Sequence, residues 1–422
     1  MPAKCAAPRA TAHLSQEYRT PAWEQRKLGQ HLKLSRELGH TGVDARKLTV
    51  KLWGKGVVEK TDLYGGSAQT QYYIRHAGQF MYGKLDFLHA AFGVVPDKLD
   101  CFESTLDSPA FDIEGLDSSF LLNLVTQEDF YLKNGNIANG SRKAKRIHEE
   151  TFLNMEIRAP ELVEQRRIGA FLDRLDSLIT LHQRKYDKLC VLKKSMLDKM
   201  FPKGGSLYPE IRFAGFTDPW EQRKLGELAS KRIEKNTNGI KETFTNSAEH
   251  GVVSQLDYFD HDITNDANIG NYSVVHPDDF IYNPRISAVA PCGPINRNKL
   301  DRNGVMSPLY TVFSVDDTID KLYLEHYFKT SRWHQFMFLE GNSGARSDRF
   351  SISDSIFFEM PIQCPVLEEQ ELIASFFGRL DSLITLHQRK YCGVASWMLG
   401  VALVRLGSES DGAFGEMKHV LR

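Results

Sequence analysis

Two stretches of the chain carry apolar residues at alternating steps of four and three, the spacing of a coiled-coil heptad. The first begins at Pro160 and Glu161, which suit the first turn of a helix, and ends at the helix-breaking run FPKGG over 201–205. The second begins at Pro365. The seam positions are Ile168, Leu172, Leu175, Ile179, His182, Tyr186 and Leu189 in the first stretch, and Ile373, Phe377, Leu380, Ile384, His387 and Tyr391 in the second. We therefore predict two long helices, the first extending about 54 Å from residue 165 to 200.

The chain contains an internal repeat, which organises its architecture. The block WEQRKLG at 23–29 recurs at 220–226, and RLDSLITLHQRKY at 174–186 recurs letter for letter at 379–391. Between these blocks, residues 30–159 and 227–364 share only scattered features. The pattern indicates a tandem duplication in which a constant frame carries two different domains.

The two equal seams favour an intramolecular coiled coil, in which antiparallel pairing would place the two domains at opposite ends about an approximate twofold axis. The alternative is that each helix packs on its own domain. Lys193 interrupts the first seam, and we expect His182 and His387 to be hydrogen-bonded seam residues rather than ligands. After Tyr391 the charged continuation is replaced by CGVASWMLG, whose two glycines each cost about 1 kcal/mol inside a helix, so we expect a weakened or frayed end.

Both variable segments are predicted to mix α and β structure. Short runs rich in β-branched and aromatic residues at 48–53, 71–74, 271–275 and 309–314 predict strands, and 118–125 and 319–338 predict helices. The predicted fold class is α+β, with two mixed domains in tandem, each followed by a long helix. The expected boundaries are an atypical leader (1–21), a first domain (22–159), a first helix (160–203), a second domain (204–364), a second helix (365–391) and an atypical tail (392–422).

Each variable segment ends in a glycine-containing basic loop just before its constant helix. Since arginine pairs bidentately with guanine edges and phosphates, these loops are candidate DNA contacts, although they could be ordinary solvated loops. Arg285 lies in a second, weaker basic region with Arg297, Lys299 and Arg302. The candidate DNA-binding residues are Arg142, Lys143, Lys145, Arg146, Arg285, Arg346 and Arg349.

Composition limits the possible functions. The 53 lysines and arginines against 54 aspartates and glutamates leave a net charge of −1, so any basic footprint must be local. No apolar run is long enough for a membrane span or a secretion signal, which predicts a cytoplasmic protein. The six cysteines form no CxxC pair, and the sequence has no phosphate loop, GxGxxG or HExxH motif. The sequence therefore predicts no catalytic residue, metal site or bound cofactor, and favours recognition over chemistry.

The two WEQRKLG blocks and the helical runs 160–186 and 365–391 resemble the specificity subunit of type I restriction-modification systems. The likeness covers nearly all of residues 22–391, including DFIYNPR at 279–285 and GVMSP at 304–308. It implies that each variable part is a target recognition domain reading one half of a split, asymmetric double-stranded DNA site, and that the two helices form the antiparallel spacer. It also implies partners: modification subunits that methylate adenine with S-adenosylmethionine, and restriction subunits that use ATP and Mg²⁺ for translocation and cleavage.

Two departures from the family pattern accompany this resemblance. Residues 1–21 do not resemble the approach PEIRFAGFTD that the chain shows at 209–218, and the tail after Tyr391 abandons the helix continuation. A rearranged, inactive specificity subunit or a purely structural coiled-coil adaptor therefore stays open. An autonomous DNA nuclease or methyltransferase is the remaining alternative, although Asn283-Pro284-Arg285 lacks the second proline and the aromatic of a methyltransferase corner.

Overall fold

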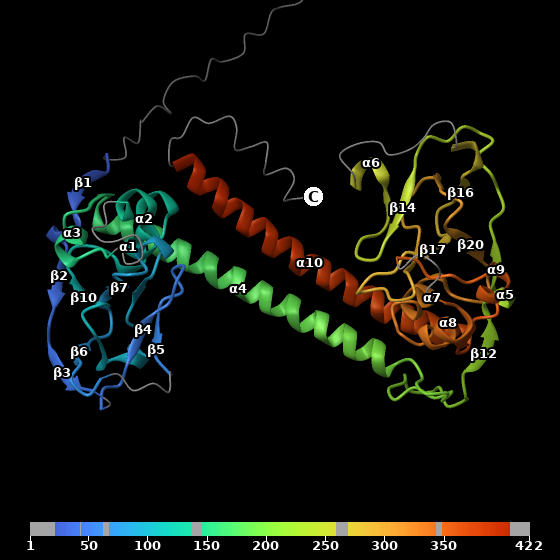
Figure 1. Ribbon diagram of the computed structural model, residues 1–422, viewed down its shortest axis with the longest axis horizontal. Helices are drawn as coiled ribbons and strands as arrows, with labels where there is room; N and C mark the ends of the chain where they lie inside the picture. Colours follow the sequence, from blue (N-terminus) through green and yellow to red (C-terminus); the bar gives the residue numbers. More distant parts are fainter. Residues whose placement is uncertain are drawn as a thin grey trace, which may run out of the picture. The chain divides into compact units, whose positions relative to one another are not determined.

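The computed structural model describes residues 22–42, 44–61, 67–136, 146–258, 269–342 and 348–405, with side chains as far as Tyr391. The chain divides into two units, Met1–Leu178 and Ile179–Arg422, and the boundary falls inside a long helix. Each unit is built around its own sheets and its own buried core (Figure 1).

The repeated WEQRK block forms a strand that closes each domain. β1 (Glu24–Lys27) pairs antiparallel with β11 (Glu156–Ala159), the strand that immediately precedes the first long helix. In the second copy, β12 (Glu221–Lys224) pairs in the same way with β21 (Pro361–Cys364). The constant frame therefore joins the start of each domain to its end, and the variable residues lie between these strands.

The first unit contains a four-stranded antiparallel sheet of order β2-β10-β7-β8 and a three-stranded sheet of order β3-β6-β9. A separate hairpin is formed by β4 and β5. The strands are β2 (Leu32–Ser35), β3 (Leu38–Thr41), β4 (Leu48–Val50), β5 (Val57–Glu59), β6 (Gln71–Arg75), β7 (Phe80–Tyr82), β8 (Phe92–Val94), β9 (Phe102–Ser104) and β10 (Ala110–Ile113). The helices are α1 (Ser118–Val125), α2 (Glu128–Gly135) and α3 (Glu149–Leu153).

The second unit repeats this layout in its main sheet. Its four strands have the order β13-β20-β17-β18, so first, fourth, second and third in chain order lie side by side, as in the first unit. The strands are β13 (Ala229–Lys231), β14 (Phe244–Ser247), β15 (Gly251–Ser254), β16 (Ser273–Val275), β17 (Phe280–Tyr282), β18 (Ile295–Arg297), β19 (Gly304–Met306) and β20 (Thr311–Val315). The short helices are α5 (Leu225–Leu228), α6 (Gln255–Tyr258), α7 (Lys321–Tyr327), α8 (His334–Glu340) and α9 (Asp354–Phe357).

Aromatic side chains fill both cores. In the first unit, the fully buried Phe152 of α3 packs on Phe80 and Tyr82 of β7, with ring centroids 5.8 and 4.5 Å apart. In the second unit, Phe280 of β17 stacks on Phe313 of β20 at 5.5 Å. Each buried ring contributes about 1.5–3 kcal/mol of apolar burial. The Phe152 contacts hold α3 against its sheet, whereas the Phe280–Phe313 pair joins two neighbouring strands of one sheet.

A buried glutamine sits at the start of each long helix and ties it to its domain. Gln165 donates to the Pro160 carbonyl at 2.8 Å and accepts from the Asp117 backbone N–H at 3.0 Å. In the second copy, Gln370 donates to Pro365 and accepts from Asp320, both at 2.9 Å. The duplicated sequence therefore forms the same junction twice.

The same two aspartates also cap the first helix of each domain. The Asp117 carboxylate accepts from the Phe120 N–H of α1, and the Asp320 carboxylate accepts from the Tyr323 N–H of α7. Because one aspartate serves both the helix cap and the glutamine junction, each domain helix is fixed in place relative to the start of its long helix.

The two long helices are α4 (Leu162–Lys199) and α10 (Leu367–Arg405). At 1.5 Å per residue, the 38 residues of α4 extend about 57 Å. The fraying predicted after Tyr391 was wrong, because α10 continues through Gly393 and Gly400 to Arg405. Alanine, leucine and methionine in this stretch are strong helix formers that offset the cost of two glycines.

The helix predicted over 319–338 is divided in the structure. α7 ends where the Thr330 hydroxyl donates to the Tyr327 carbonyl at 2.7 Å, and α8 begins only at His334. Between them the buried Trp333 donates its ring N–H to the Phe328 carbonyl at 3.2 Å. The side-chain hydrogen bonds of the turn therefore replaced a continuous helical ladder.

Candidate nucleic-acid interface and spacer helices

Within the second unit, the part of α4 from Ile179 onward pairs antiparallel with α10, as Figure 1 shows for the green and red helices. His182 Nδ1 lies 2.9 Å from His387 Nδ1, and further along α4 the Lys193 ammonium lies 2.5 Å from the Asp381 carboxylate. Residue numbers rise along one helix as they fall along the other. The prediction of an antiparallel intramolecular helix pair is therefore confirmed.

Seam residues of both helices merge with the core of the second domain. Leu189 and Met196 of α4 pack against the cluster that contains Ile373, Phe377 and Leu380 of α10. The remaining seam positions of this unit are half-buried: Ile179, His182, Tyr186, Ile384, His387 and Tyr391. The helix pair is thus held by apolar packing near the domain and by a polar contact at the two histidines.

The first-unit seam positions behave differently. Ile168 packs against the core of the first domain, beside residues such as Phe120. Leu172 and Leu175 are half-buried. A role of these three residues in helix pairing stays a prediction.

Lys193, which breaks the heptad pattern, lies in a charged network at the base of the second domain. Its half-buried side chain pairs with Asp381 of α10. The positive charge of Lys193 also disfavours protonation of the buried His326 of α7. Burial, followed by Lys193, lowers the pKa of His326 to about 4. Neither ring nitrogen of His326 has a hydrogen-bond partner among the described residues. Because its pKa is lowered, this histidine is neutral near pH 7.

The basic loop of the first domain lies mostly outside the described residues. Arg142, Lys143 and Lys145 fall in the stretch 137–145 that the structure does not describe. Arg146 is described, and its guanidinium lies 3.6 Å from the Asp107 carboxylate at a partly exposed surface.

The basic loop of the second domain is better defined. Arg346 lies outside the described residues, but Arg285 and Arg349 face one another in an isolated antiparallel bridge. Backbone hydrogen bonds from Ile286 to Asp348 at 3.0 Å and from Phe350 to Pro284 at 2.8 Å hold this contact. The structure therefore brings two predicted DNA-binding arginines together from segments far apart in sequence.

Arg285 is the more available of the two. Its side chain is 70% exposed, and its ion pair with Asp348 is long, at 3.8 Å. A long pair between exposed groups contributes little energy, so phosphate or a base edge can compete for this guanidinium.

The weaker basic region around residue 297 is largely neutralised inside the domain. Arg297 pairs with Asp278 and with Glu325 of α7, and Lys299 also pairs with Glu325. Although burial opposes it, these cations lower the pKa of Glu325. The exposed Arg302 pairs with Glu242 at 3.0 Å. Among the residues first grouped as basic here, Arg285 is therefore the candidate that the structure favours.

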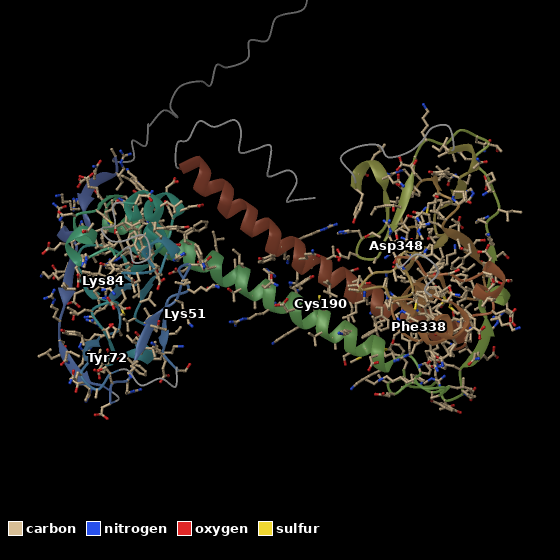
Figure 2. The ribbon with its side chains drawn as sticks, viewed as in Figure 1. Lys51, Tyr72, Lys84, Cys190, Phe338 and Asp348 are labelled. Carbon is tan, nitrogen blue, oxygen red and sulfur yellow. The ribbon has the colours of Figure 1, made fainter. Side chains whose placement is uncertain are left out.

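Sequence reasoning missed a basic aromatic turn in the first domain. The turn 51–56 between β4 and β5 exposes Lys51, Trp53 and Lys55, and Lys51 is labelled in Figure 2. Trp53 is 56% exposed with φ 59°, and Lys51 and Lys55 are both exposed. The glycines that bracket Lys55 were the signal for this turn.

A second missed feature lies beside the bridged arginines. Phe338 of α8 is 56% exposed, and its ring centroid lies 6.2 Å from that of Phe350, next to Arg349 (Figure 2). Exposed aromatics beside arginines are common where a protein contacts DNA bases or sugars. In sequence, Phe338 was assigned only to a predicted helix.

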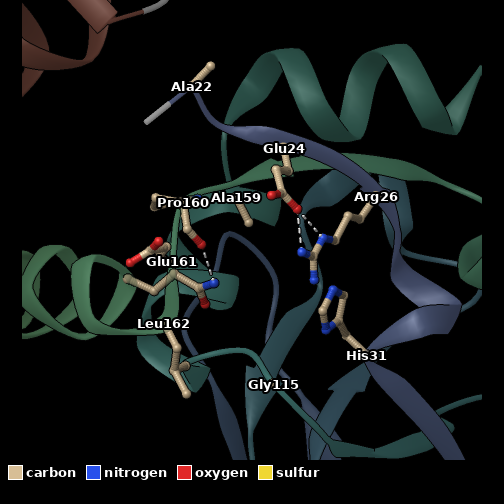
Figure 3. A pocket seen from close by; sticks show the side chains of 10 residues that line it. Ala22, Glu24, Arg26, His31, Gly115, Ala159, Pro160, Glu161 and Leu162 are labelled. Carbon is tan, nitrogen blue, oxygen red and sulfur yellow. Dashed lines mark hydrogen bonds and ion pairs between the residues drawn. The ribbon is translucent and has the colours of Figure 1, made fainter. Parts of the chain in front are cut away.

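A surface pocket of about 270 Å³ lies at the start of α4 and is lined mainly by residues of the constant frame, together with His31 and Gly115 of the variable part (Figure 3). Arg26 is paired with Glu24 in its wall, and Gln165 is engaged with Pro160. His31 donates from Nδ1 to the Glu114 carbonyl at 2.9 Å. The ring nitrogen Nε2 of His31 is buried without a hydrogen-bond partner among the described residues. The residues that line this pocket include no serine, threonine, cysteine or lysine to serve as a nucleophile beside it.

Comparison with known proteins places the chain in a family. The family described as type I restriction modification DNA specificity domain matches residues 111–190 and 217–394, together more than half of the chain. The chain therefore belongs to this family. The resemblance stated from the WEQRKLG blocks and the two helical runs is confirmed.

Solved structures of this class are also similar to the chain. The S subunit of a type I restriction-modification system from M. genitalium aligns with TM-score 0.50 and 10% identity, covering 91% of this chain and 95% of that chain. The HsdS subunit from Thermoanaerobacter tengcongensis aligns with TM-score 0.43 and 16% identity over 90% and 95% of the two chains. A chain solved for complex assembly and conformational transition of the type I R-M system aligns with TM-score 0.41 and 16% identity over 89% and 94%. At such identities, the likeness to the M. genitalium subunit concerns the fold alone.

Proposed function

We propose that this chain is the DNA sequence-specificity subunit of a type I restriction-modification complex, binding one bipartite, asymmetric target in double-stranded DNA. The single observation that carries the proposal is the repeated frame. The two domains have the same strand order in their main sheet and the same kind of glutamine junction, yet they differ in the residues between their constant strands. A duplicated frame with different contents suits a protein that reads two different half-sites.

The surfaces proposed to meet DNA are local, as the balanced net charge requires. In the second domain they are Arg285 and Arg349, with Phe338 packed on Phe350, the residue that follows Arg349. In the first domain they are Lys51, Trp53 and Lys55 of the turn 51–56. Arginine and lysine supply phosphate contacts and guanine readout, and exposed rings supply stacking or sugar contacts. The basic loops around Arg142 and Arg346 remain candidates for the same role.

The paired helices act in this proposal as the spacer between the two half-sites. Half-sites in adjacent major grooves lie about 34–36 Å apart, a distance that a helix of about 57 Å can span. A rigid helical pair then fixes both the separation of the two half-sites along the DNA and their rotational phase around it.

The same helices offer apolar surface to the partner subunits. Leu181 of α4 and its repeat counterpart Leu386 of α10 are 45% and 44% exposed, and Leu383 is 43% exposed. Duplication therefore presents equivalent leucines on both helices, which suits modification subunits that bind in more than one copy. We assign S-adenosylmethionine to these partners, and ATP and Mg²⁺ to the restriction subunits, with no cofactor held by this chain.

The complex acts in the cytoplasm in this proposal, where bacterial DNA is accessible to it. None of the described helices, α4 and α10 included, carries the apolar stretch that crossing a bilayer requires.

Reconstitution with the modification subunits tests the proposal. We expect adenine methylation of one bipartite sequence only when the chain is present, and none from the chain alone. Exchanging residues 227–359 for those of a relative with another target should change the second half-site and leave the first unchanged. Methyl transfer by the chain alone would favour an autonomous enzyme, and an unchanged specificity after the exchange would favour a structural adaptor.

A further inference from the structure

Three different kinds of metal-binding side chain meet at one end of the three-stranded sheet of the first domain. His76 follows β6, whereas Asp100 and Cys101 precede β9, which pairs with β6 through Arg75 and Phe102. One ring nitrogen of His76, one carboxylate oxygen of Asp100 and Sγ of Cys101 all lie within 4.8 Å of one another. Imidazole, carboxylate and thiolate are the set of donors that zinc accepts together.

The backbone holds two of these donors in place. The Asp100 carboxylate accepts from the Ala77 N–H at 2.9 Å and lies 3.2 Å from His76 Nδ1. The Cys101 N–H donates to the Arg75 carbonyl at 2.9 Å, and its thiol donates to Asp100 at 3.5 Å. Cys101 has φ 60°, a left-handed conformation that residues other than glycine rarely adopt. The contact among the donors therefore rests on fixed backbone positions as well as on side-chain rotamers.

A fourth residue orients the imidazole. His76 Nε2 donates to the Glu37 carboxylate at 2.9 Å, and Glu37 immediately precedes β3. A carboxylate on the far nitrogen of a histidine fixes the tautomer and raises the basicity of the nitrogen that faces a metal. With Nε2 engaged by Glu37, Nδ1 is the nitrogen that faces Asp100 and Cys101.

We propose that His76 Nδ1, the Asp100 carboxylate and Cys101 Sγ bind one zinc-like divalent cation, with Glu37 positioning the histidine. A fourth position is left for water, so the ion is four-coordinate. On binding, the Cys101 thiol loses its proton and any proton on His76 Nδ1 is released to solvent. The bound ion links the ends of β6 and β9 directly, and β3 through Glu37.

The proposal departs from the expectation of no metal site that the cysteine spacing had suggested. That expectation rested on CxxC pairs, whereas this cluster uses one cysteine with ligands from a neighbouring strand. The competing interpretation is a set of ion pairs in which a protonated His76 lies between Glu37 and Asp100. In the absence of metal, the hydrogen bond to Glu37 raises the pKa of His76, so protons and metal compete for the ring.

Cobalt titration of the chelator-treated full chain tests the proposal, because a thiolate ligand gives Co²⁺ a charge-transfer absorption. We expect one equivalent of Co²⁺ to produce this band and Zn²⁺ to displace it. His76→Ala and Cys101→Ser should abolish the band, and Glu37→Gln should weaken affinity by about ten- to a hundred-fold. His89→Ala is the matched control, since His89 forms an exposed pair with Asp86 at 3.8 Å without a thiol.

Cys101→Gly separates loss of the ligand from loss of the fold. Glycine adopts φ 60° without strain, so this variant should unfold at the same or a higher temperature without metal, and yet show no cobalt band. Cys190→Ser, which removes a thiol on α4, should leave the band intact. The proposal is overturned if Co²⁺ gives no thiolate band with the unmodified chain, or if the band persists in Cys101→Gly or His76→Ala.

Discussion

Nδ1 of His182 lies 2.9 Å from Nδ1 of His387, and the two histidines occupy the same position in the two copies of RLDSLITLHQRKY. Equivalent residues meet in an antiparallel pair at the approximate twofold axis that relates its two helices. One nitrogen must donate and the other accept, so the contact requires that at least one ring is neutral. Because of the duplication, a histidine of one helix meets its own counterpart on the other. The contact forms only when at least one of the two rings is neutral.

Acid should weaken the helix pair. Burial, the facing His387 and nearby lysines lower the pKa of His182, so the unfolded chain binds a proton more readily than the folded chain does. The stabilisation is therefore present above about pH 6.5 and is lost as pH falls below it. Urea unfolding between about pH 8 and pH 5 measures the slope of the free energy of unfolding against pH.

The double variant His182→Gln, His387→Gln is the comparison for that slope. Glutamine keeps a side-chain hydrogen bond within reach and does not titrate, so the fall in stability should be smaller in the variant. The buried His326 should contribute a similar fall in both proteins, since neither substituted histidine is among the groups that shift its pKa. Equal slopes in the two proteins would contradict the role of the histidine pair.

Lys193 should stabilise the second unit only together with Asp381. The two side chains are 22% and 38% exposed, so the pair is partly screened and Lys193→Met should cost about 1 kcal/mol of unfolding free energy. In Lys193→Met, Asp381→Leu, the apolar seam is continuous and we expect that loss to be recovered. Denaturant unfolding of both single variants and the double variant gives the coupling. Lys194→Met, at an exposed position of the same helix, serves as the control. If the stability changes of the two single variants simply add up in the double variant, Lys193 and Asp381 do not stabilise each other.

Gln370 should contribute far more to the free energy of unfolding than exposed residues of α10 do. It is 2% exposed and serves both the Asp320 N–H and the Pro365 carbonyl, so Gln370→Leu leaves two buried backbone groups without partners. Each such group costs about 1–3 kcal/mol, and we expect a loss of at least about 2 kcal/mol. Gln388→Leu, at an exposed position of the same helix, should change stability little. Similar losses in the two variants would show that the junction is not structural.

Arg285 should contribute to DNA binding through charge. With the reconstituted complex, Arg285→Ala should weaken binding of the target duplex, and a phosphate contact predicts that the salt slope falls by about one. Arg302→Ala removes an exposed arginine that is paired with Glu242, and it should leave both quantities nearly unchanged. Binding curves over a range of KCl concentrations provide the test. Identical slopes for the Arg285 variant and the unmodified chain would remove Arg285 from the interface.

The long helices and their pairing could be predicted because their signal is local and repeated. Heptad spacing identified the seam, and identity between 174–186 and 379–391 indicated that the two helices are alike. The significance of Lys193 could not be predicted in this way. Its partner Asp381 is 188 residues away, and only the antiparallel register brings the two together.

Within the domains, short strands of aromatic and β-branched residues were recognisable, but their pairing was not. The predicted run 71–74 forms β6, whereas the strand role of WEQRK depends on a partner more than a hundred residues away. Candidate site residues could likewise be identified one at a time, but not as parts of one surface. Arg285 and Arg349 were selected separately from sequence, and only the isolated bridge between them showed that they belong to one surface.

The helix pair should set the gap in the DNA target. Inserting one heptad at equivalent places in α4 and α10 adds about 10.5 Å to the spacer, so the gap should lengthen by up to about three base pairs. Both half-sites should stay unchanged, because neither domain is altered. Exchanging seven exposed residues of the same helices without insertion is the matched control.

A map of adenine methylation in cells that carry the partner genes tests the central claim most directly. With the gene for this chain present, the account predicts methylation of one bipartite sequence, which disappears when the gene is deleted and reappears with a longer gap when the heptad-extended form is supplied. A methylation map that is the same with and without this chain would contradict the account.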